Sequence, residues 1–379
     1  MSTTVLDTAV VGAGAAGLLV GRRLADRGVR FELFDDHARI GDSWRERYRS
    51  LRLFTPRPYL NLSGLKIDIG RFAHPTGQQM GDYLERYARH FRLPVRTSTR
   101  VVSLTRTDDG RFRLALADGD DVIAGQVIVT AGGHRIPVAP GFASRLDPSI
   151  HQLHSLDYQG PEQFADGPVL VVGAANSGTD VALEAAANGH AVTLAGRHPG
   201  HVPVDIDTPI GNLLSGIFIR RLRNVTIESP KGRAMKEHEA HHGVMLVRNS
   251  LRDLERAGIA QTGRIDHVDD AGRPVTADGT VIEAATVVWC TGSRPDLDWI
   301  DIDGVVDAAG HPVEQRGLAR GCPGLGFVGM PFQYSVASST LMGMDRDAEY
   351  VVDALAALAA TSVGTAPVTG TAMRARMAA

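Results

Sequence analysis

The chain has 379 residues with 40 basic and 43 acidic side chains, which gives a formal net charge of −3. At roughly 150 residues per domain, this length predicts two or three domains. The balanced charge disfavours a nucleic-acid-binding protein, which typically carries a basic face. Hydrophobic residues make up 43% of the chain and charged residues 22%, proportions typical of a globular protein rather than a disordered one.

The two cysteines, Cys290 and Cys322, do not form a CxxC motif, which excludes a redox-active dithiol and a four-cysteine zinc site. Two reduced cysteines in a cytosolic protein are the favoured interpretation, with one structural disulfide as the alternative. A basic, histidine-rich stretch within 207–243 has no partners at ligand spacing elsewhere in the chain. The sequence therefore predicts no metal site.

One apolar stretch, Val5–Val20, could mimic a targeting signal. It lacks a basic segment before it, carries Asp7 and is broken by glycines, so it fits neither a signal peptide nor a membrane span. We expect a soluble cytoplasmic protein with no membrane or nucleic-acid partner. The sequence leaves open whether it forms a homo-oligomer.

A strand–helix–strand unit opens the chain. Thr8–Val11 is an apolar run typical of a buried strand, Leu18–Leu24 has the apolar spacing of a helix, and Val29–Phe34 alternates like a second strand that ends at Asp35. The first turn carries the GxGxxG spacing, and an acidic residue about 20 positions later completes the dinucleotide-binding fingerprint. The three glycines are Gly12, Gly14 and Gly17.

Each residue of this fingerprint has a separate physical role. Gly12 allows the tight turn, Gly14 lets the backbone approach a diphosphate, and Gly17 lets helix and strand pack closely. The helix begins near Ala15, where free N–H groups would face the phosphates. Asp35 would accept hydrogen bonds from a ribose diol. A glycine-rich turn without a ligand is the alternative interpretation.

A second unit of the same kind follows. The strand Val169–Val172 leads through a loop into a helix at Thr179–Ala187, and Ala191–Ala195 forms the next strand. Arg197, rather than an acidic residue, follows that strand, and arginine there favours the 2′-phosphate of NADP. An exposed loop arginine is the alternative. The loop residues we expect at the nucleotide are Gly173, Asn176, Ser177 and Gly178.

Other segments complete the expected secondary structure. Met80–Phe91 predicts a helix, and the runs Val95–Leu104, Phe112–Ala117 and Gln126–Thr130 predict a small antiparallel meander beside the first unit. Val287–Trp289 predicts a further buried strand. The tail at 361–379 is small and polar, and we expect it to be mobile.

These motifs resemble those of the two-dinucleotide-fold flavoproteins, in particular the flavin-containing monooxygenases with their CzcO-like and YUCCA-like members. The resemblance covers about residues 5 to 355. It is carried by the segments VVGAGAAG, IGDSWRERY, LRLFTPRPY, VTAGG, VVGAANSGTDVA, WCTGSRPD, GFVGMPF and GMDRDAEY, which begin at Val10, Ile40, Leu51, Val129, Val171, Trp289, Gly326 and Gly343.

The resemblance implies an α/β fold with two Rossmann-like dinucleotide-binding domains, the second inserted in the first. The FAD domain would span residues 1–155 and 289–360, and the NADPH domain residues 156–288. Gly41, Trp44 and Arg45 match the family's Gly-Gly-x-Trp loop beside the flavin, with Asp42 in place of the second glycine. The segments around Ala131 and at Thr291-Gly292 match the family's linkers, which pass close to the cofactors.

The family's FxGxxxHxxxY fingerprint is only partly present. His154 and Tyr158 match it, whereas Pro148 and Ile150 replace the phenylalanine and the glycine. Tyr158 argues against the Baeyer–Villiger subclass, whose version of the motif ends in tryptophan. The fingerprint therefore leaves the subclass open.

By this resemblance, the expected function is an FAD- and NADPH-dependent monooxygenase that uses O2 and a C4a-(hydro)peroxyflavin to oxygenate a small organic substrate. The alternatives are an NADPH oxidase or reductase that produces H2O2 or passes electrons to a partner, and a non-enzymatic redox-sensing flavoprotein. No catalytic side chain can be named from the sequence. Four aromatic residues favour an apolar or aromatic substrate, although they would equally serve as core: Phe54, Tyr59, Phe332 and Tyr334.

Overall fold

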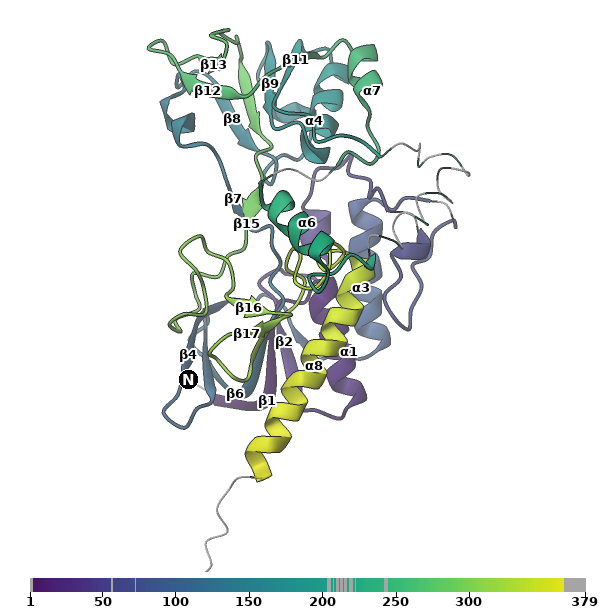
Figure 1. Cartoon of the computed structure of the whole chain (residues 1–379), viewed down its shortest axis with the longest axis vertical. Helices are drawn as coiled ribbons and strands as arrows, with labels where there is room; N and C mark the ends of the chain where they lie inside the picture. The colour runs from purple at the N-terminus through teal and green to yellow at the C-terminus, as the bar shows by residue number, and fades with distance from the viewer. Residues whose placement is uncertain are drawn as a thin grey trace, which may run out of the picture.

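Two α/β units, each built on its own sheet, follow one another along the long axis of the molecule (Figure 1). The computed structural model describes residues 3–364, apart from 56, 72, 203–205, 207, 209–210, 212–213, 215–216, 218–220, 222 and 242–244. The fold is that of two dinucleotide-binding domains, as the sequence predicted.

The first unit contains a nine-stranded sheet in the order β16-β17-β18-β6-β1-β2-β3, with β5 also paired to β6 and β4 to β5. Its central strands are buried on both faces, which explains their continuous apolar sequences. The strands are β1 (Thr3–Val11), β2 (Phe31–Phe34), β3 (Val95–Arg96), β4 (Val101–Arg106), β5 (Phe112–Leu116), β6 (Asp121–Val129), β16 (Glu314–Gln315), β17 (Leu318–Ala319) and β18 (Leu325–Phe327).

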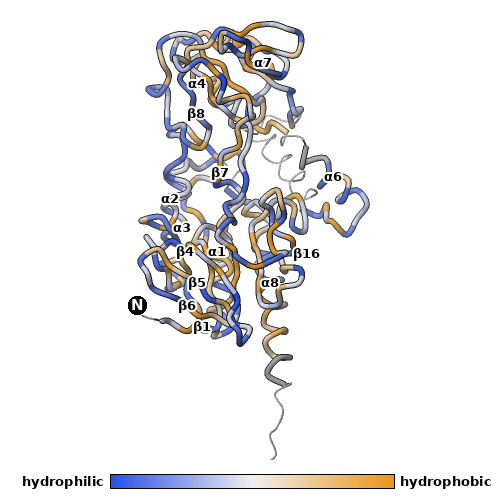
Figure 2. Tube along the Cα trace, turned by 90° about the vertical axis from the view of Figure 1, so that its left-hand side faces the viewer, coloured by the Kyte–Doolittle hydropathy of each residue, from blue (hydrophilic) through white to orange (hydrophobic). Residues whose placement is uncertain are grey.

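Three helices pack on one face of this sheet and enclose its larger core cluster. The helices are α1 (Ala15–Asp26), α3 (Gly77–His90) and α8 (Leu341–Gly364), and α8 runs along the unit in yellow (Figure 1). A second core cluster covers the opposite face between β4, β5 and the segment 297–305. Hydrophobic stretches lie inside both units, whereas hydrophilic stretches follow the outer loops (Figure 2).

The predicted meander forms only in part. β4 and β5 are antiparallel, and β5 is antiparallel to the first half of β6. However, β6 is also parallel to β1 along its length and to β18 at its end. The run Gln126–Thr130 therefore belongs to the central sheet, because its residues are buried between two parallel neighbours.

The second unit has a five-stranded sheet in the order β11-β10-β9-β14-β8, in which every pair is parallel. Helices α4 and α7 cover one face, and the β12–β13 hairpin with the 3-10 helix η2 covers the other. The elements are η2 (Gly141–Arg145), β8 (His151–His154), β9 (Val169–Val172), α4 (Asn176–Ala187), β10 (Val192–Ala195), α7 (Leu251–Arg256), β11 (Ala260–Thr262), β12 (Ile265–Val268), β13 (Pro274–Thr276) and β14 (Thr286–Trp289).

The chain passes between the units twice, at β7 (Ile136–Pro137) and β15 (Ser293–Arg294), which pair antiparallel. The second unit begins before the expected boundary at residue 155, because β8 pairs with β14 and η2 packs on the second sheet. At the other end, 361–364 continue α8, and the rest of the tail expected to be mobile lies outside the described residues.

Short elements complete the described chain. α2 (Asp42–Arg45), the 3-10 helix η1 (Arg57–Tyr59) and α6 (Pro230–His241) lie near the junction of the units, and the 3-10 helix η3 (Pro161–Gln163) belongs to the second unit. Among the described residues, no helix combines the length and the apolar character needed to cross a membrane.

Candidate functional site

A cavity of about 540 Å³ lies at the junction of the two units and is lined by residues of both. From the first unit it takes the glycine loop, the end of β2, the segment 43–55 and the start of α8. From the second unit it takes the N-terminus of α4. The cavity therefore touches both predicted nucleotide-binding loops.

The first glycine loop has the shape of a diphosphate cradle. A Cβ atom at Gly17 would lie 2.0 Å from the carbonyl oxygen of Gly12, so only glycine allows this packing. A Cβ at Gly14 would meet nothing within 4 Å, which leaves the open approach that a phosphate needs. Gly14 is also the N-cap of α1 and offers no side-chain acceptor, so the first-turn amides at Ala15 remain available to a ligand.

Asp35 lies where a ribose-binding carboxylate is expected and lines the cavity. One of its oxygens accepts the backbone N–H of Ala13 at 2.6 Å, and the other accepts Nδ1 and the backbone N–H of His37. These bonds hold the carboxylate against the glycine loop. Its remaining lone pairs can accept hydroxyl groups.

His37 is a residue that the sequence analysis missed. Hydrogen bonds to the carboxylates of Asp35 and Asp36 raise the pKa of His37 to about 10, so the ring is protonated at neutral pH. These three side chains are close enough together to hold a metal ion. Protonated His37 and Arg135, which also pairs with Asp36, offset the charges of the two carboxylates, so the cluster forms an internal ion-pair network.

The segment that matches the family's Gly-Gly-x-Trp loop reaches the cavity only in part. Trp44 lines the cavity. Gly41 caps α2 and lies against the backbone of Gly81 in α3, which leaves no room for a side chain there. Arg45 does not reach the cavity: its guanidinium pairs with Asp42 at 2.8 Å and with two carboxylates of α3. Arg45 thus ties α2 to α3, and its contact with a cofactor stays a prediction.

The second glycine loop repeats the first. A Cβ at Gly178 would lie 1.7 Å from the carbonyl oxygen of Gly173, and Gly173 itself is pressed against the backbone of Cys290. Asn176 and Ser177 begin α4 and line the cavity. α4 also starts without a side-chain cap, so its first-turn amides are available to a second diphosphate.

Arg197 follows β10, as the sequence predicted for a nucleotide phosphate. It is exposed, it does not line the cavity, and its side chain makes no hydrogen bond or ion pair with the described residues. Its role remains a prediction.

The two linker segments, around Ala131 and at Thr291-Gly292, differ in whether they line the cavity. Ala131 lines the cavity, whereas Thr291 and Gly292 do not. Thr291 donates its hydroxyl to the carbonyl of Val138, and Gly292 accepts a hydrogen bond at 3.0 Å from Nε2 of His154. The second linker therefore lies outside the cavity lining. It is held in place by the Thr291 hydroxyl and by His154, the histidine of the family fingerprint.

Three further residues missed by the sequence analysis line the cavity at the junction. The hydroxyl of Tyr48, from the first unit, donates to Asp180 of α4 at 2.8 Å. Burial and this carboxylate raise the pKa of Tyr48 above its usual range. Arg47, next to Tyr48, also faces the cavity. A tertiary contact between distant segments gives no signal in a single sequence, so only the structure could reveal this group.

The cysteines are both free, which confirms the favoured interpretation. Cys322 belongs to a core cluster of the first unit and Cys290 packs against one in the second. Burial raises the pKa of Cys290 to about 12, so its thiol is not a nucleophile at neutral pH.

The four aromatic residues considered for a substrate pocket separate in the structure. Phe54 and Tyr59 line the cavity, together with Leu51, Leu53 and Leu60. In contrast, Phe332 is part of the core with 3% exposure, and Tyr334 lies at a different cavity.

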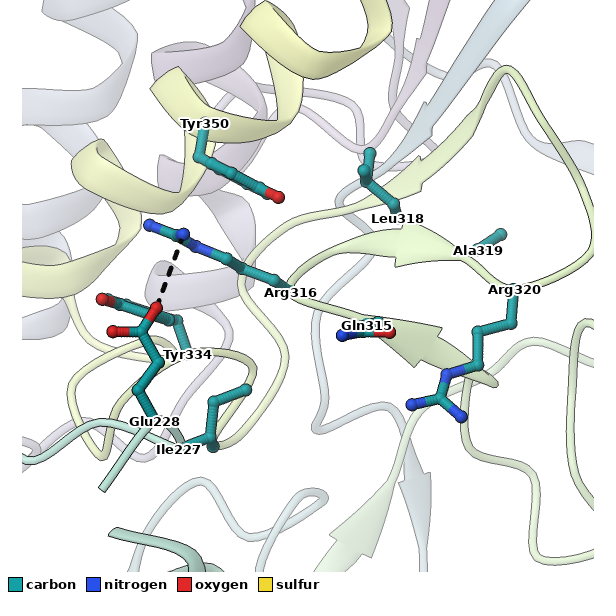
Figure 3. A pocket seen from close by; sticks show the side chains of 9 residues that line it. All are labelled: Ile227, Glu228, Gln315, Arg316, Leu318, Ala319, Arg320, Tyr334 and Tyr350. Carbon is teal, nitrogen blue, oxygen red and sulfur yellow. Dashed lines mark ion pairs between the residues drawn. The ribbon is translucent and has the colours of Figure 1, made fainter.

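That second cavity, of about 470 Å³, lies between β16–β17, the segment at Ile227-Glu228 and α8 (Figure 3). Arg316 extends between the rings of Tyr334 and Tyr350, 4.1 and 3.9 Å from their centroids, and its ion pair with Glu228 is 3.7 Å long. This arginine is already stacked and paired, and of the predicted site residues only Tyr334 lines this cavity, whereas both nucleotide-binding segments reach the junction cavity. The junction cavity is therefore the better candidate site.

Comparisons with known proteins identify the family of the chain. Residues 9–243 match the family model described as pyridine nucleotide-disulphide oxidoreductase. A CzcO-like uncharacterized oxidoreductase of Geobacillus kaustophilus is 34% identical over 353 residues, which cover 92% of this chain and 98% of that protein. Indole-3-pyruvate monooxygenase YUCCA1 of Oryza sativa is 30% identical over 202 residues, about half of each chain.

Among solved structures, a flavin-containing monooxygenase from Stenotrophomonas maltophilia superimposes with a TM-score of 0.77 at 24% identity, covering 94% of this chain and 99% of that one. A cyclohexanone monooxygenase superimposes with a TM-score of 0.66 at 16% identity over 96% of this chain. Both likenesses show the shared two-domain fold. The chain therefore belongs to the pyridine nucleotide-disulphide oxidoreductase family, in its CzcO-like branch, and is a flavin-dependent oxidoreductase related to the class B monooxygenases.

Proposed function

We propose that the protein is an FAD- and NADPH-dependent monooxygenase that uses O2 to oxygenate a small organic substrate. The observation that carries this proposal is that one cavity is lined by the first glycine loop and by Asn176 and Ser177, which lie between Gly173 and Gly178 of the second. Hydride transfer requires that the reacting parts of two dinucleotides come into contact, and one shared cavity provides that proximity.

The described residues suit two dinucleotides in these positions. The first-turn amides of α1 and the carboxylate of Asp35 would hold the diphosphate and a ribose of FAD, and the first-turn amides of α4 would hold the diphosphate of NADPH. Arg197 would pair with the 2′-phosphate. FAD, when bound, supplies the redox chemistry, which explains why the cavity needs no catalytic triad or metal.

The protein would contribute position and shielding. Trp44, Leu51, Leu53 and Phe54 form an apolar wall from one continuous segment, and Met342 and Met344 add to the apolar lining from α8. Such a wall excludes water from a bound substrate. The mixed aliphatic and aromatic lining supports a small apolar substrate.

The test uses the FAD-loaded protein and measures NADPH oxidation, O2 consumption and H2O2 release, alone and with a thioether, a tertiary amine or a ketone. A monooxygenase should form an oxygenated product from one of them while H2O2 released per NADPH falls. Release of one H2O2 per NADPH with every compound would identify an oxidase instead. A chain that cannot retain FAD would contradict the proposal altogether.

A further inference from the structure

Most charged side chains of the junction cavity are either paired or exposed to solvent. Four arginines line it, namely Arg47, Arg52, Arg100 and Arg135. Arg135 forms an ion pair with Asp36 at 2.5 Å, and Arg100 forms one with Asp296 at 3.5 Å. Arg52 is exposed to solvent, which screens its charge.

The carboxylates of the cavity are occupied in the same way. Asp35 accepts from the loop amide and from His37. Asp180 accepts from Tyr48 at 2.8 Å, from Asn249 at 2.5 Å and from Arg248 at 3.3 Å. No carboxylate of the described cavity wall is therefore left to neutralise a further cation.

Arg47 is the exception. Its backbone N–H closes a turn onto Trp44, but its guanidinium makes no hydrogen bond or ion pair with any described residue. It is only partly exposed, and burial together with the nearby Arg135 lowers the pKa of Arg47. Burial and the charge of Arg47 likewise lower the pKa of His134. Among the described residues around Arg47, Tyr48 favours the charged guanidinium, but the pKa of Tyr48 is itself raised above its usual range, and no carboxylate pairs with Arg47.

An unpaired, partly desolvated guanidinium is costly to keep in a folded protein. It presents five donors in a planar fork that matches two oxygens of a carboxylate or phosphate. We infer that Arg47 is an anion-binding residue of the junction cavity and that it pairs with a carboxylate or phosphate group of a bound ligand. This inference rests on the proposed function, since the ligand occupies the same cavity.

Two sources can supply such a group: the organic substrate, as a carboxylate, or one of the two dinucleotides, as its phosphates. Variants Arg47→Gln and Arg47→Lys distinguish them. The first removes the charge, and the second keeps the charge but loses the fork. Arg49→Gln is the matched control, because Arg49 lies on the same segment but is 62% exposed and pairs with Glu162 outside the cavity.

One arm measures the dinucleotides, as FAD bound per chain and as the Kd for NADP+ from the flavin absorbance. The other arm titrates the FAD-loaded protein, saturated with NADP+, with formate, benzoate or neutral benzamide. We expect Arg47→Gln to weaken either dinucleotide binding or carboxylate binding by about 10- to 100-fold. Arg47→Lys should have an intermediate effect, and Arg49→Gln should bind as the unchanged protein does. Loss of formate or benzoate binding alone assigns the substrate, and loss of FAD or NADP+ assigns the dinucleotide.

The inference is overturned if Arg47→Gln binds FAD, NADP+ and both carboxylates within twofold of the unchanged protein, including the case in which neither protein binds a carboxylate. If Arg47→Gln does not fold, as judged by its melting temperature, Arg47→Lys alone decides by the same criterion. All measurements are of binding. They therefore remain informative even if the protein oxygenates none of the compounds tested for the proposed function.

Discussion

The two glycine loops share their geometry but differ at the end of the strand that follows. In both, a Cβ atom added to a glycine of the helix would lie 2.0 Å or less from a carbonyl oxygen of the loop, so only glycine fits there. In the first unit, Asp35 is 12% exposed and bonded to the loop amide. In the second, Arg197 is exposed and bonded to no described residue. The first site is thus organised before a ligand binds, whereas the charge at the second is left for the ligand.

The largest expected effects come from filling the two close contacts separately. Gly178→Val would force a side chain into the carbonyl of Gly173, and Gly17→Val would do the same in the first loop. Overpacking of this kind costs about 1–3 kcal/mol or more in folding free energy, and it displaces the loop from the shape that would hold a diphosphate. We expect Gly178→Val to keep FAD and lose NADPH binding, and Gly17→Val to lose FAD.

Absorbance of the purified variants and titration with NADP+ measure both losses. Gly141→Ala, outside the cavity, is the control, since an added Cβ there also meets nothing within 4 Å. It should leave FAD content and NADP+ binding unchanged. Loss of FAD from Gly178→Val, with the fold retained, would contradict the separation of the two sites.

Arg197→Ala should come next in size. A guanidinium that pairs with a 2′-phosphate is a charge-assisted contact, but Arg197 is exposed and solvent weakens its pairs. We therefore expect the KM for NADPH to rise roughly tenfold, about 1.4 kcal/mol, while that for NADH and the FAD content change little. Steady-state kinetics with both nucleotides measure this. Equal weakening of both would show that Arg197 is only a surface charge.

A smaller effect concerns His37. Its counterpart in the second unit, three residues after the end of β10, is His198, whose pKa is lowered by burial instead of raised. The ring of His37 lies 2.9 Å from Asp35, 3.1 Å from Asp36 and 3.6 Å from Glu46, and Arg135 also pairs with Asp36. Because its pKa rises from 6.5 to about 10 on folding, protonated His37 stabilises the folded state fully below pH 6.5. That stabilisation is lost as the pH rises through 10.

His37→Asn should therefore lower the melting temperature at pH 6.5 by several degrees, and the difference from the unchanged protein should disappear near pH 10. Melting curves of both proteins across this pH range test it. A difference that stays constant with pH would mean that the ring acts by packing rather than by charge.

The smallest expected effect lies in the contact that joins the units. Tyr48→Phe removes the hydroxyl that donates to Asp180, while Asn249 and Arg248 still satisfy that carboxylate. We expect a loss of about 1 kcal/mol in unfolding free energy with FAD content unchanged. Asp180→Asn, which weakens all three contacts, should cost more. Thermal unfolding of the two variants measures the order.

The sequence predicted best what local pattern and spacing determine. The strand Val169–Val172 forms with those bounds, both glycine loops lie between a strand and a helix, and Asp35 ends β2 beside the first loop. The direction in which a side chain points was harder to predict. Arg45 and Arg47 are two residues apart with the same side chain, yet Arg45 packs on α3 and Arg47 faces the cavity. Only tertiary packing decides between them.

The prediction of which sheet a strand joins failed for a similar reason. β6 has the alternating start of a hairpin strand and the continuous apolar end of a parallel one, so its pattern fits two sheets at once. β8 is short and mostly polar, and its place in the second sheet depends on pairing with β14, more than 130 residues later. Long-range pairing of this kind leaves little signal in a single chain.

The central claim is that two dinucleotides meet in one cavity, and anaerobic mixing of the FAD-loaded protein with NADPH tests it most directly. If they do, the flavin absorbance should bleach in a single turnover. The bleaching should be slower when the transferred hydride of NADPH is replaced by deuteride. NADH should bleach the flavin less efficiently. A flavin that stays oxidised under saturating NADPH would contradict the account.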